Sequence, residues 1–349
     1  MFDTSFDALI PLGWGPRVQE LFAEFDAPDV WPGRVTRVER DACVVASPSG
    51  SVVARATELP AVGDWVALRT VDRDLWVHAI LPRWSRLARG GADDGATQVM
   101  AADVDIVLIT APADRLSPAR VERELVIAWE SGAQPVVVLT KHDLAPEGLA
   151  DQLTSRLVSV DVVATSTLTG DGIDTVADLL APDRTGVLLG PSGSGKSSLI
   201  NALLGEGRLA TGDVRAGDQR GRHTTTWREL IVLPAGGVLI DTPGIRSVGL
   251  VEGDALAETF GEIDALLGSC RFSDCSHSTE PGCALNAAVA DGRVSPERLA
   301  SWNKLQRELA RFDPASRRAT KAVGRQRVKG MRQLRNFEAR FDPKQRDDD

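Results

Sequence analysis

The stretch that decides the fold is Gly190-Pro191-Ser192-Gly193-Ser194-Gly195-Lys196-Ser197-Ser198. It follows a short apolar run at 187–189 and leads into a helix-like pattern at 199–204. This order predicts a strand, a glycine-rich loop and a helix. The stretch matches G-x-x-x-x-G-K-[ST] at every fixed position.

Each residue type in this stretch has a physical reason. Glycines let backbone N–H groups point at phosphate oxygens, and the helix adds the positive end of its dipole. We therefore expect Lys196 to reach the β- and γ-phosphates of a nucleotide, and the Ser197 hydroxyl to bind Mg²⁺. The alternative is a glycine-rich turn that binds nothing. It is the weaker interpretation, because the strand, the helix, the Lys and the Ser are all in place.

Length and composition indicate a multidomain globular protein. The chain has 349 residues, which suggests two or three domains at roughly 150 residues each. No apolar run approaches the roughly 18–20 residues of a membrane span. The acidic start, residues 1–7, lacks the basic region of a signal peptide. We therefore expect a cytoplasmic protein without membrane contact, and a monomer.

Charge is distributed unevenly along the chain. Residues 301–349 hold 14 basic and seven acidic side chains, whereas residues 1–300 hold 26 basic and 42 acidic ones. A charge run is usually a solvated helix face. An acidic body with a basic arm is also a pattern for contacting nucleic acid. The basic tail, residues 313–349, is therefore expected either to be solvated or to contact RNA.

The first third of the chain predicts a leader and a small barrel. Residues 1–30 form the leader, with one amphipathic helical turn near Leu21 and Phe25. Residues 31–82 contain five short β runs, at 33–38, 42–46, 51–56, 63–69 and 74–80. An OB-fold is the best interpretation, because it has five strands and often binds nucleic acid. Trp65, Trp76 and Trp84 are expected either to stack on nucleic-acid bases or to pack in the barrel core. Packing in the core is favoured for Trp65 and Trp76.

The middle of the chain has α/β periodicity. Residues 83–100, rich in Arg and Gly, are expected to be a linker, and residues 101–250 a nucleotide-binding domain. Strands are expected at 104–110, 135–140, 162–163, 187–189, 227–233 and 238–240. Helices are expected from Ser117 to Gly132 and after Gly172. This alternation predicts a mostly parallel sheet with helices on both faces.

A second phosphate-related motif follows the last of these strands. Asp241-Thr242-Pro243-Gly244 has the form D-x-x-G and begins 45 positions after Lys196. Asp241 is expected to hold the Mg²⁺ shell, and the Gly244 N–H to sense the γ-phosphate. The polar stretch 205–226 lies between the two motifs. We expect Thr225, with Thr224 as the close alternative, to offer a hydroxyl to Mg²⁺; otherwise these threonines merely begin the next strand.

Base specificity is predicted by Thr140-Lys141-His142-Asp143. This tetrapeptide ends a predicted strand and is similar to the [NT]-K-x-D signature of GTPases. The Asp143 carboxylate can accept from guanine N1–H and N2–H₂ together, whereas adenine would leave it unpaired. A P-loop ATPase is therefore disfavoured. Ser166 and Thr167 fit the loop that closes over the base.

The order of these motifs is unusual. In Ras-like GTPases the phosphate loop precedes the guanine motif, whereas here Lys141 precedes Gly190. The domain is therefore expected to be circularly permuted, which is tolerated because domain termini tend to lie close together. The motif at Asp241 then leads directly into the C-terminal segment, so nucleotide state can move that segment.

Residues 251–312 are expected to form a zinc-binding helical domain. Cys270, Cys275, His277 and Cys283 have the spacing C-x4-C-x-H-x5-C. Three thiolates and one imidazole are a closed tetrahedral set typical of structural Zn²⁺. A disulfide is disfavoured by the expected compartment. A helix is expected from about residue 295 to 311.

Together these features resemble the ribosome small-subunit-dependent GTPase A family (RsgA, also called YjeQ). The resemblance covers about residues 30–300, and its most specific pieces are 221–226 and 270–283. It implies a cytoplasmic enzyme that hydrolyses GTP to GDP and phosphate. It also implies a role in late assembly of the small (30S) ribosomal subunit, which stimulates hydrolysis, with that subunit and its rRNA as partners.

The residue after Gly244 bears on the rate of hydrolysis. Ile245 stands where Ras-like enzymes carry a water-orienting Gln, so turnover is expected to be slow unless another group is supplied, which is worth ~10³–10⁵ in rate. His223 is an internal candidate, or else a loop residue facing solvent or RNA. Slow turnover also leaves open an RNA-binding module in which GTP is a bound effector.

Overall fold

The strands of alternating sequence in the first part of the chain form a closed five-stranded barrel. The computed structural model describes residues 6–90, 97–157, 160–205, 229–241, 255–273, 275–277 and 280–312. The barrel strands run in the order β1-β2-β3-β5-β4, and β1 pairs antiparallel with β4 to close the barrel. Its strands are β1 (Val30–Val38), β2 (Ala42–Ser47), β3 (Gly50–Arg55), β4 (Trp65–Val71) and β5 (Asp74–Ile80). The predicted five-stranded barrel is confirmed.

The leader packs against this barrel. It contains η1 (Asp7–Leu12), α1 (Pro16–Phe22) and η2 (Ala23–Phe25), so it is more helical than the single predicted turn. Trp14 lies with its ring centroid 5.5 Å from that of Trp65 and 6.0 Å from that of Phe22. Trp65 is fully buried, which confirms packing rather than base stacking for this residue.

The central domain is built on a six-stranded sheet in the order β10-β9-β8-β11-β13-β12. Five strands are parallel, and the edge strand β12 runs antiparallel to β13. The strands are β8 (Ile106–Pro112), β9 (Gln134–Thr140), β10 (Asp161–Ala164), β11 (Thr185–Leu189), β12 (Glu229–Val232) and β13 (Val238–Asp241). The predicted mostly parallel sheet is therefore confirmed.

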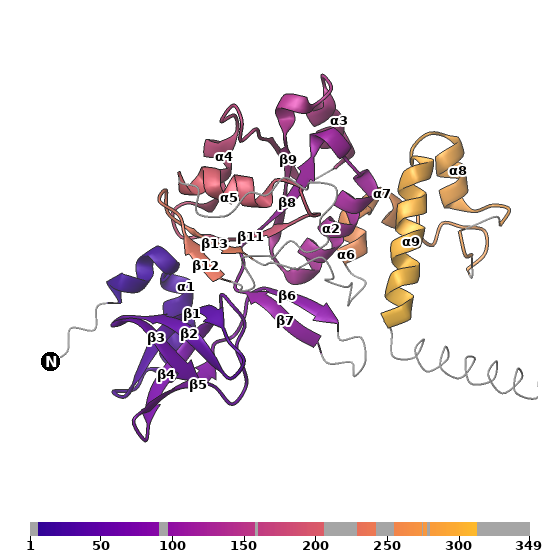
Figure 1. Ribbon diagram of the computed structural model, residues 1–349. Coiled ribbons are helices and arrows are strands. Elements are labelled where there is room, and N and C mark those ends of the chain that lie inside the picture. Colours follow the sequence, from indigo (N-terminus) through magenta and orange to yellow (C-terminus); the bar gives the residue numbers. More distant parts are fainter. Residues whose placement is uncertain are drawn as a thin grey trace, which may run out of the picture.

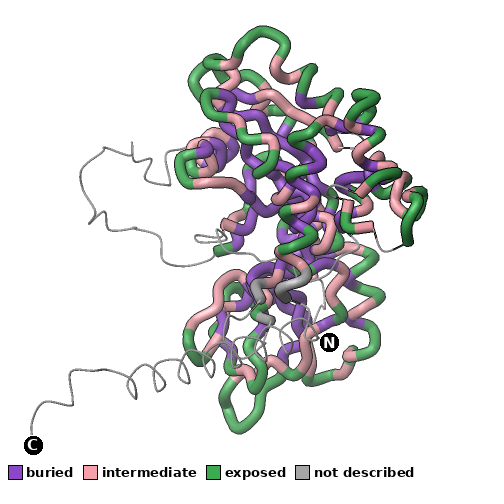
Figure 2. Tube along the Cα trace, turned by 90° about the vertical axis from the view of Figure 1, so that its right-hand side faces the viewer, coloured by how far each residue is buried: buried purple, intermediate pink, exposed green. Residues whose placement is uncertain are grey.

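Helices cover both faces of the central sheet (Figure 1). Alternate residues of β8 point to opposite faces: Val107 belongs to the core cluster with α2 (Pro118–Ser131), and Leu108 to the cluster with α4 (Ile173–Leu180) and α5 (Lys196–Leu204). All of β8 is buried, as expected of a strand packed on both sides. A fourth helix, α3 (Leu149–Arg156), follows the guanine motif. Figure 2 shows this buried core as a column inside exposed helices and loops.

The segment expected to be a linker carries two strands. β6 (Arg86–Gly90) and β7 (Thr97–Ala102) pair antiparallel in a separate two-stranded sheet. This hairpin lies between the barrel and the central domain (Figure 1). The expected linker at 83–100 therefore carries a hairpin that the sequence did not predict. Its Arg- and Gly-rich composition concealed the short strands.

The C-terminal part of the chain is helical. It contains α6 (Ala255–Thr259), α7 (Gly261–Asp264), α8 (Ala284–Ala290) and α9 (Pro296–Phe312). The predicted helix at 295–311 is confirmed by α9, which lies beside α6 and α7 (Figure 1). Within the described ranges, none of the helices combines the length and apolar character that a membrane crossing requires.

The barrel and the central sheet are joined by backbone and by a buried charge. Strand β1 pairs with β12, so the two sheets are continuous. Arg34 of β1 is 1% exposed. Its guanidinium donates to the carbonyls of Leu12, Gly63 and Asp103 and, at 2.7 Å, to the Thr185 hydroxyl. Leader, barrel and central domain therefore meet at one side chain.

A buried carboxyl lies beside this arginine. Asp103 accepts hydrogen bonds from the backbone N–H of Trp65 at 3.2 Å and of Trp84 at 3.3 Å. Burial raises the pKa of Asp103 to about 7, and the charge of Asp64 adds to the effect. The Arg34 charge and the two N–H groups act in the opposite direction.

Replacing Asp103 with Asn should flatten the pH dependence of stability. Because the pKa is raised in the folded chain, the contribution of Asp103 to the free energy of unfolding is fully present below about pH 4. It is lost as the pH rises through about 7. Urea unfolding between about pH 5 and pH 8 should show a smaller decline for Asp103→Asn than for the parent chain. Identical pH profiles would contradict this assignment.

Candidate functional site

The glycine-rich loop joins β11 to α5 as predicted. Lys196 is the first residue of α5, and Gly195 precedes it with φ of 91°. Gly190 has φ of 143°, and a Cβ at this position would lie 2.1 Å from Thr110 Oγ1. These conformations require glycine, so the motif is fixed by geometry as well as by ligand chemistry.

The Lys196 side chain lies along the inside of this loop. Its ammonium donates to the carbonyls of Gly190 at 2.8 Å and Pro191 at 2.7 Å. Ser197 and Ser198 follow in the first turn of α5. The ammonium, the first-turn hydroxyls and the backbone of the loop are thus within one short stretch, as a phosphate site requires.

The guanine motif touches the phosphate loop directly. Thr140 ends β9, and its hydroxyl donates to the Ser194 carbonyl at 2.7 Å. The Ser194 hydroxyl in turn lies 2.6 Å from Thr110 Oγ1 of β8. The neighbouring strands β9, β8 and β11 bring these three residues to the carboxyl edge of the sheet, where ligands bind in open α/β folds.

The rest of the guanine motif forms a tight turn after β9. Lys141 adopts a left-handed conformation with φ of 56°, and its ammonium lies 2.8 Å from Asp114. Asp143 lies in η4 (His142–Leu144) and accepts from the Ser166 hydroxyl at 2.6 Å. Ser166 is buried, whereas Asp143 and Thr167 are exposed. The structure therefore brings Asp143 and Ser166 together, with the carboxylate open to solvent rather than buried.

Asp241 ends β13, the strand beside β11. Burial raises the pKa of its carboxyl, and the charge of Lys196 acts in the opposite direction. Because β13 pairs in parallel with β11, which leads into the phosphate loop, Asp241 ends its strand at the same edge of the sheet. Several predicted residues of the same site lie outside the described residues: His223, Thr224, Thr225, Gly244, Ile245 and the basic tail, residues 313–349.

Two supporting residues were not predicted from the sequence. Thr110 supports the loop through Ser194, and its hydroxyl also donates to the Leu189 carbonyl at 2.8 Å. Arg115, at the end of η3 (Ala113–Arg115), donates to the Gly193 carbonyl at 2.6 Å. The position of Thr110 at the end of the predicted strand 104–110 was the only sign of its role in the sequence. Nothing in the sequence indicated the role of Arg115.

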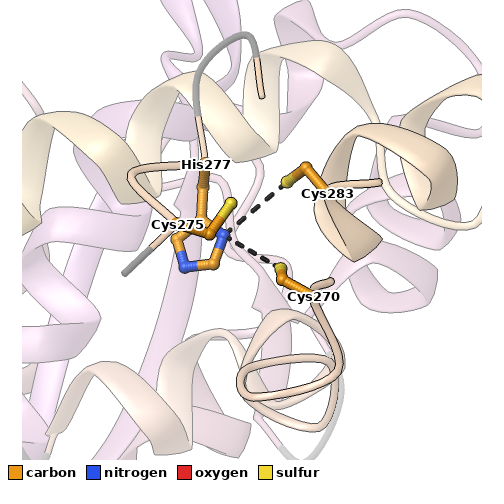
Figure 3. A group of neighbouring side chains, drawn as sticks. All are labelled: Cys270, Cys275, His277 and Cys283. Carbon is orange, nitrogen blue, oxygen red and sulfur yellow. Dashed lines mark hydrogen bonds between the residues drawn. The ribbon is translucent and has the colours of Figure 1, made fainter. Parts of the chain in front are cut away.

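The second site is the Cys-His cluster (Figure 3). The ligand atoms of Cys270, Cys275, His277 and Cys283 all lie within 4.8 Å of one another. His277 Nδ1 is 3.5 Å from Cys270 Sγ and 3.7 Å from Cys283 Sγ. All four cysteines of the chain are free thiols. The predicted ligand set is therefore assembled around one point and could hold a metal ion.

The surroundings of the cluster favour its function as a ligand set. The Ala284 N–H, in the first turn of α8, donates to Cys270 Sγ at 3.3 Å and lowers the pKa of that thiol, whereas burial and the neighbouring thiols raise the pKa of Cys275 to about 11. A lower thiol pKa favours the thiolate, which is the form that binds metal. The His277 ring packs edge-on against Trp302 of α9, with centroids 5.8 Å apart. The cluster is thereby attached to the longest C-terminal helix.

Comparison with known proteins agrees with this arrangement. A family profile described as RsgA GTPase matches residues 80–251. A protein of Opitutus terrae named "Small ribosomal subunit biogenesis GTPase RsgA" is 42% identical, over 96% of this chain and all of its own. The chain belongs to the RsgA GTPase family. A protein of the same name from Streptomyces avermitilis is also 42% identical, over 89% of this chain and 88% of its own.

Solved structures support the fold of this RsgA-family chain. YjeQ from Thermotoga maritima aligns with a TM-score of 0.59 and 26% identity, over 80% of this chain and 98% of its own. YloQ, described as a circularly permuted GTPase, aligns with a TM-score of 0.57 and 24% identity, over 82% and 97% of the two chains. The permuted motif order and the fold class predicted from the sequence are confirmed.

Replacing Thr140 with Val should weaken nucleotide binding by roughly tenfold, or about 1.4 kcal/mol. Val preserves the shape of Thr but leaves the buried Ser194 carbonyl without its donor. Binding of a fluorescent guanine nucleotide measures the effect. Thr154→Val is the matched control, because Thr154 donates only within α3, to Ala150. Unchanged affinity of Thr140→Val would show that this contact does not support the loop.

Proposed function

We propose that this RsgA-family chain hydrolyses GTP to GDP and phosphate during biogenesis of the small ribosomal subunit. The relatives named above carry that role in their names. The observation that carries the proposal is the Thr140–Ser194 contact, which joins a guanine-recognition motif to a phosphate loop. We also propose a cytoplasmic monomer whose partners are the small subunit, its rRNA and GTP or GDP.

The roles of the nucleotide-site residues follow from their chemistry. The backbone of 190–195 and the Lys196 ammonium bind phosphates. Asp143, held by Ser166 at 2.6 Å, accepts from the guanine N1–H and N2–H₂, and Lys141 and Thr167 border the base. Ser197 and Asp241 are the side chains to hold Mg²⁺, which would neutralise charge on the β- and γ-phosphates. By sequence, Thr225 completes the Mg²⁺ ligands and the Gly244 N–H senses the γ-phosphate.

Hydrolysis by the chain alone should be slow. Ile245 cannot orient a water molecule, so a missing group must be supplied by the ribosomal partner or by His223. A group of this kind contributes ~10³–10⁵ in rate, which is roughly 4–7 kcal/mol. His223→Ala should therefore lower partner-stimulated turnover if the imidazole positions the water.

GTP turnover, measured alone and with small ribosomal subunits, tests the function. We expect strong stimulation that is specific to small subunits and to GTP, with ATP as the control nucleotide. Fast turnover without subunits would contradict the argument from Ile245. Tight GTP binding without turnover in either condition would instead indicate an RNA-binding module with GTP as an effector. Equal use of ATP would indicate a P-loop ATPase.

We propose that the Cys-His cluster holds one structural Zn²⁺. Three thiolates and an imidazole with ligand atoms inside 4.8 Å match a closed tetrahedral site, which leaves no open position for catalysis. The ion would hold 270–283 in one conformation and so fix the start of α8 next to α9. It has a structural role in this proposal and takes no part in hydrolysis.

Metal content tests the zinc proposal directly. The purified chain should contain about one zinc per molecule, measured by mass spectrometry of the metal, and Cys283→Ser should lose it together with thermal stability. Cys43→Ala is the matched control, because Cys43 lies in the barrel core, outside the cluster. Full zinc content in Cys283→Ser, or loss of zinc in Cys43→Ala, would contradict the assignment.

A further inference from the structure

A basic cleft lies on the outer flank of the phosphate loop. Its volume is about 550 Å³, and it is bounded by loop residues 190–192, by α2 and by α9. In the described part of the chain, four cationic side chains from three separate elements line it: Arg115, Arg120, Arg123 and Lys304. None of these residues has been given a role in binding the nucleotide itself.

The charges of this cleft differ from those of the rest of the chain. Residues 1–300 carry 16 more acidic than basic side chains, yet the described residues that line the cleft include four cations and a single carboxylate, Glu124. Glu124 is paired with Arg120 at 3.1 Å. The side chains of Arg115 and Arg120 are 54% and 46% exposed, and Arg115 lies 3.9 Å from Asp114. A ligand from solvent would therefore reach both guanidiniums in competition with the carboxylates beside them.

Helix α9 is firmly attached to α2, so Lys304 has a defined place in the cleft. Arg123 of α2 forms an ion pair with Glu308 of α9 at 2.6 Å. Arg298 of α9, which is buried, lies 3.1 Å from the fully buried Glu122 of α2. The cleft is therefore a built junction between the phosphate loop, the central domain and the C-terminal helices.

The lining selects phosphate rather than a nucleobase. None of the described residues that line the cleft is aromatic, so it offers no surface on which a base could stack. Arginine forks and a lysine ammonium are the side chains that bind phosphate oxygens most readily. Exposed cations spread over three elements fit a strand that passes across the cleft better than a small enclosed molecule.

The cleft also communicates with the nucleotide site. Arg115 donates to the carbonyls of Gly193 at 2.6 Å and Ser192 at 3.4 Å. A phosphate group in the cleft would compete with these carbonyls for the guanidinium. Moving this donor would change the polarity and position of loop peptides whose N–H groups face the nucleotide.

We propose that this cleft binds phosphates of an RNA backbone, and that Arg115 passes its occupancy to the phosphate loop. The inference rests on the proposed function, because it supplies a route by which an RNA partner would alter GTP turnover. It assigns to Arg115 a positioning role rather than a catalytic one.

Two variants, one that removes a positive charge from the cleft and one that removes its negative charge, test this proposal. Binding of a fluorescent single-stranded RNA in the presence of GDP should be about tenfold weaker for Lys304→Ala, with a salt dependence reduced by about one phosphate contact. Glu124→Gln should bind more tightly than the parent chain, a gain that misfolding cannot mimic. Arg307→Ala is the matched control: Arg307 also lies on α9, but it donates to Asn303 and does not line the cleft. It should bind as the parent chain does.

Each result has a defined meaning. Equal effects of Lys304→Ala and Arg307→Ala, or no gain in Glu124→Gln, would overturn the proposal. Tripolyphosphate binding that depends on Lys304, with RNA binding unchanged, would overturn it in favour of a small phosphate compound. Turnover with small subunits is measured in parallel. Absence of stimulation in the parent chain would reject the proposed function, whereas the RNA affinities would still decide whether the cleft binds RNA.

Discussion

The arrangement of the barrel on the central domain depends on one buried guanidinium. Burial lowers the pKa of Arg34 to about 10, so it remains charged at neutral pH. A charge that is buried away from water is tolerated only where its N–H donors find hydrogen-bond acceptors. The acceptors are Leu12 in the leader, Gly63 before β4, and Asp103 and Thr185 in the central domain. A barrel shifted relative to the sheet would leave this charge unpaired, so the interaction selects one orientation.

The nucleotide site depends on a different constraint, the common edge at which parallel strands end. Thr110, Thr140 and Ser194 are spread over 85 positions of the sequence. At this edge of the sheet they form one continuous line of hydrogen bonds. Because strand adjacency rather than chain order makes this line, the site survives circular permutation. The new order leads from Asp241 directly to the C-terminal helices. Helix α2 lines the cleft beside the loop and is ion-paired to α9. Because α9 packs against His277 of the Cys-His cluster, the two sites are connected through α2 and α9.

Much of this molecule could be predicted because its signals are local. Glycine spacing, an apolar run before it and a helical pattern after it specify the phosphate loop. Ligand type and spacing specify the Cys-His cluster, and alternation specifies the barrel strands. The hairpin β6–β7 escaped prediction because its strands are short and β6 lies in a segment rich in Arg and Gly. Its antiparallel pairing, rather than an apolar pattern, defines it.

The sequence by itself determined the set of chemical groups: a guanine motif, a phosphate loop, a set of three cysteines and one histidine, and a barrel. Tertiary structure alone decided which distant groups meet. Arg34 belongs to no motif, yet it is buried between the barrel and the central domain. Arg115 and Lys304 carry no motif, yet they line one cleft on the phosphate loop. The reason is physical: a local pattern records how a segment meets water and its own backbone, whereas contacts across 50 or more residues depend on how the whole chain packs.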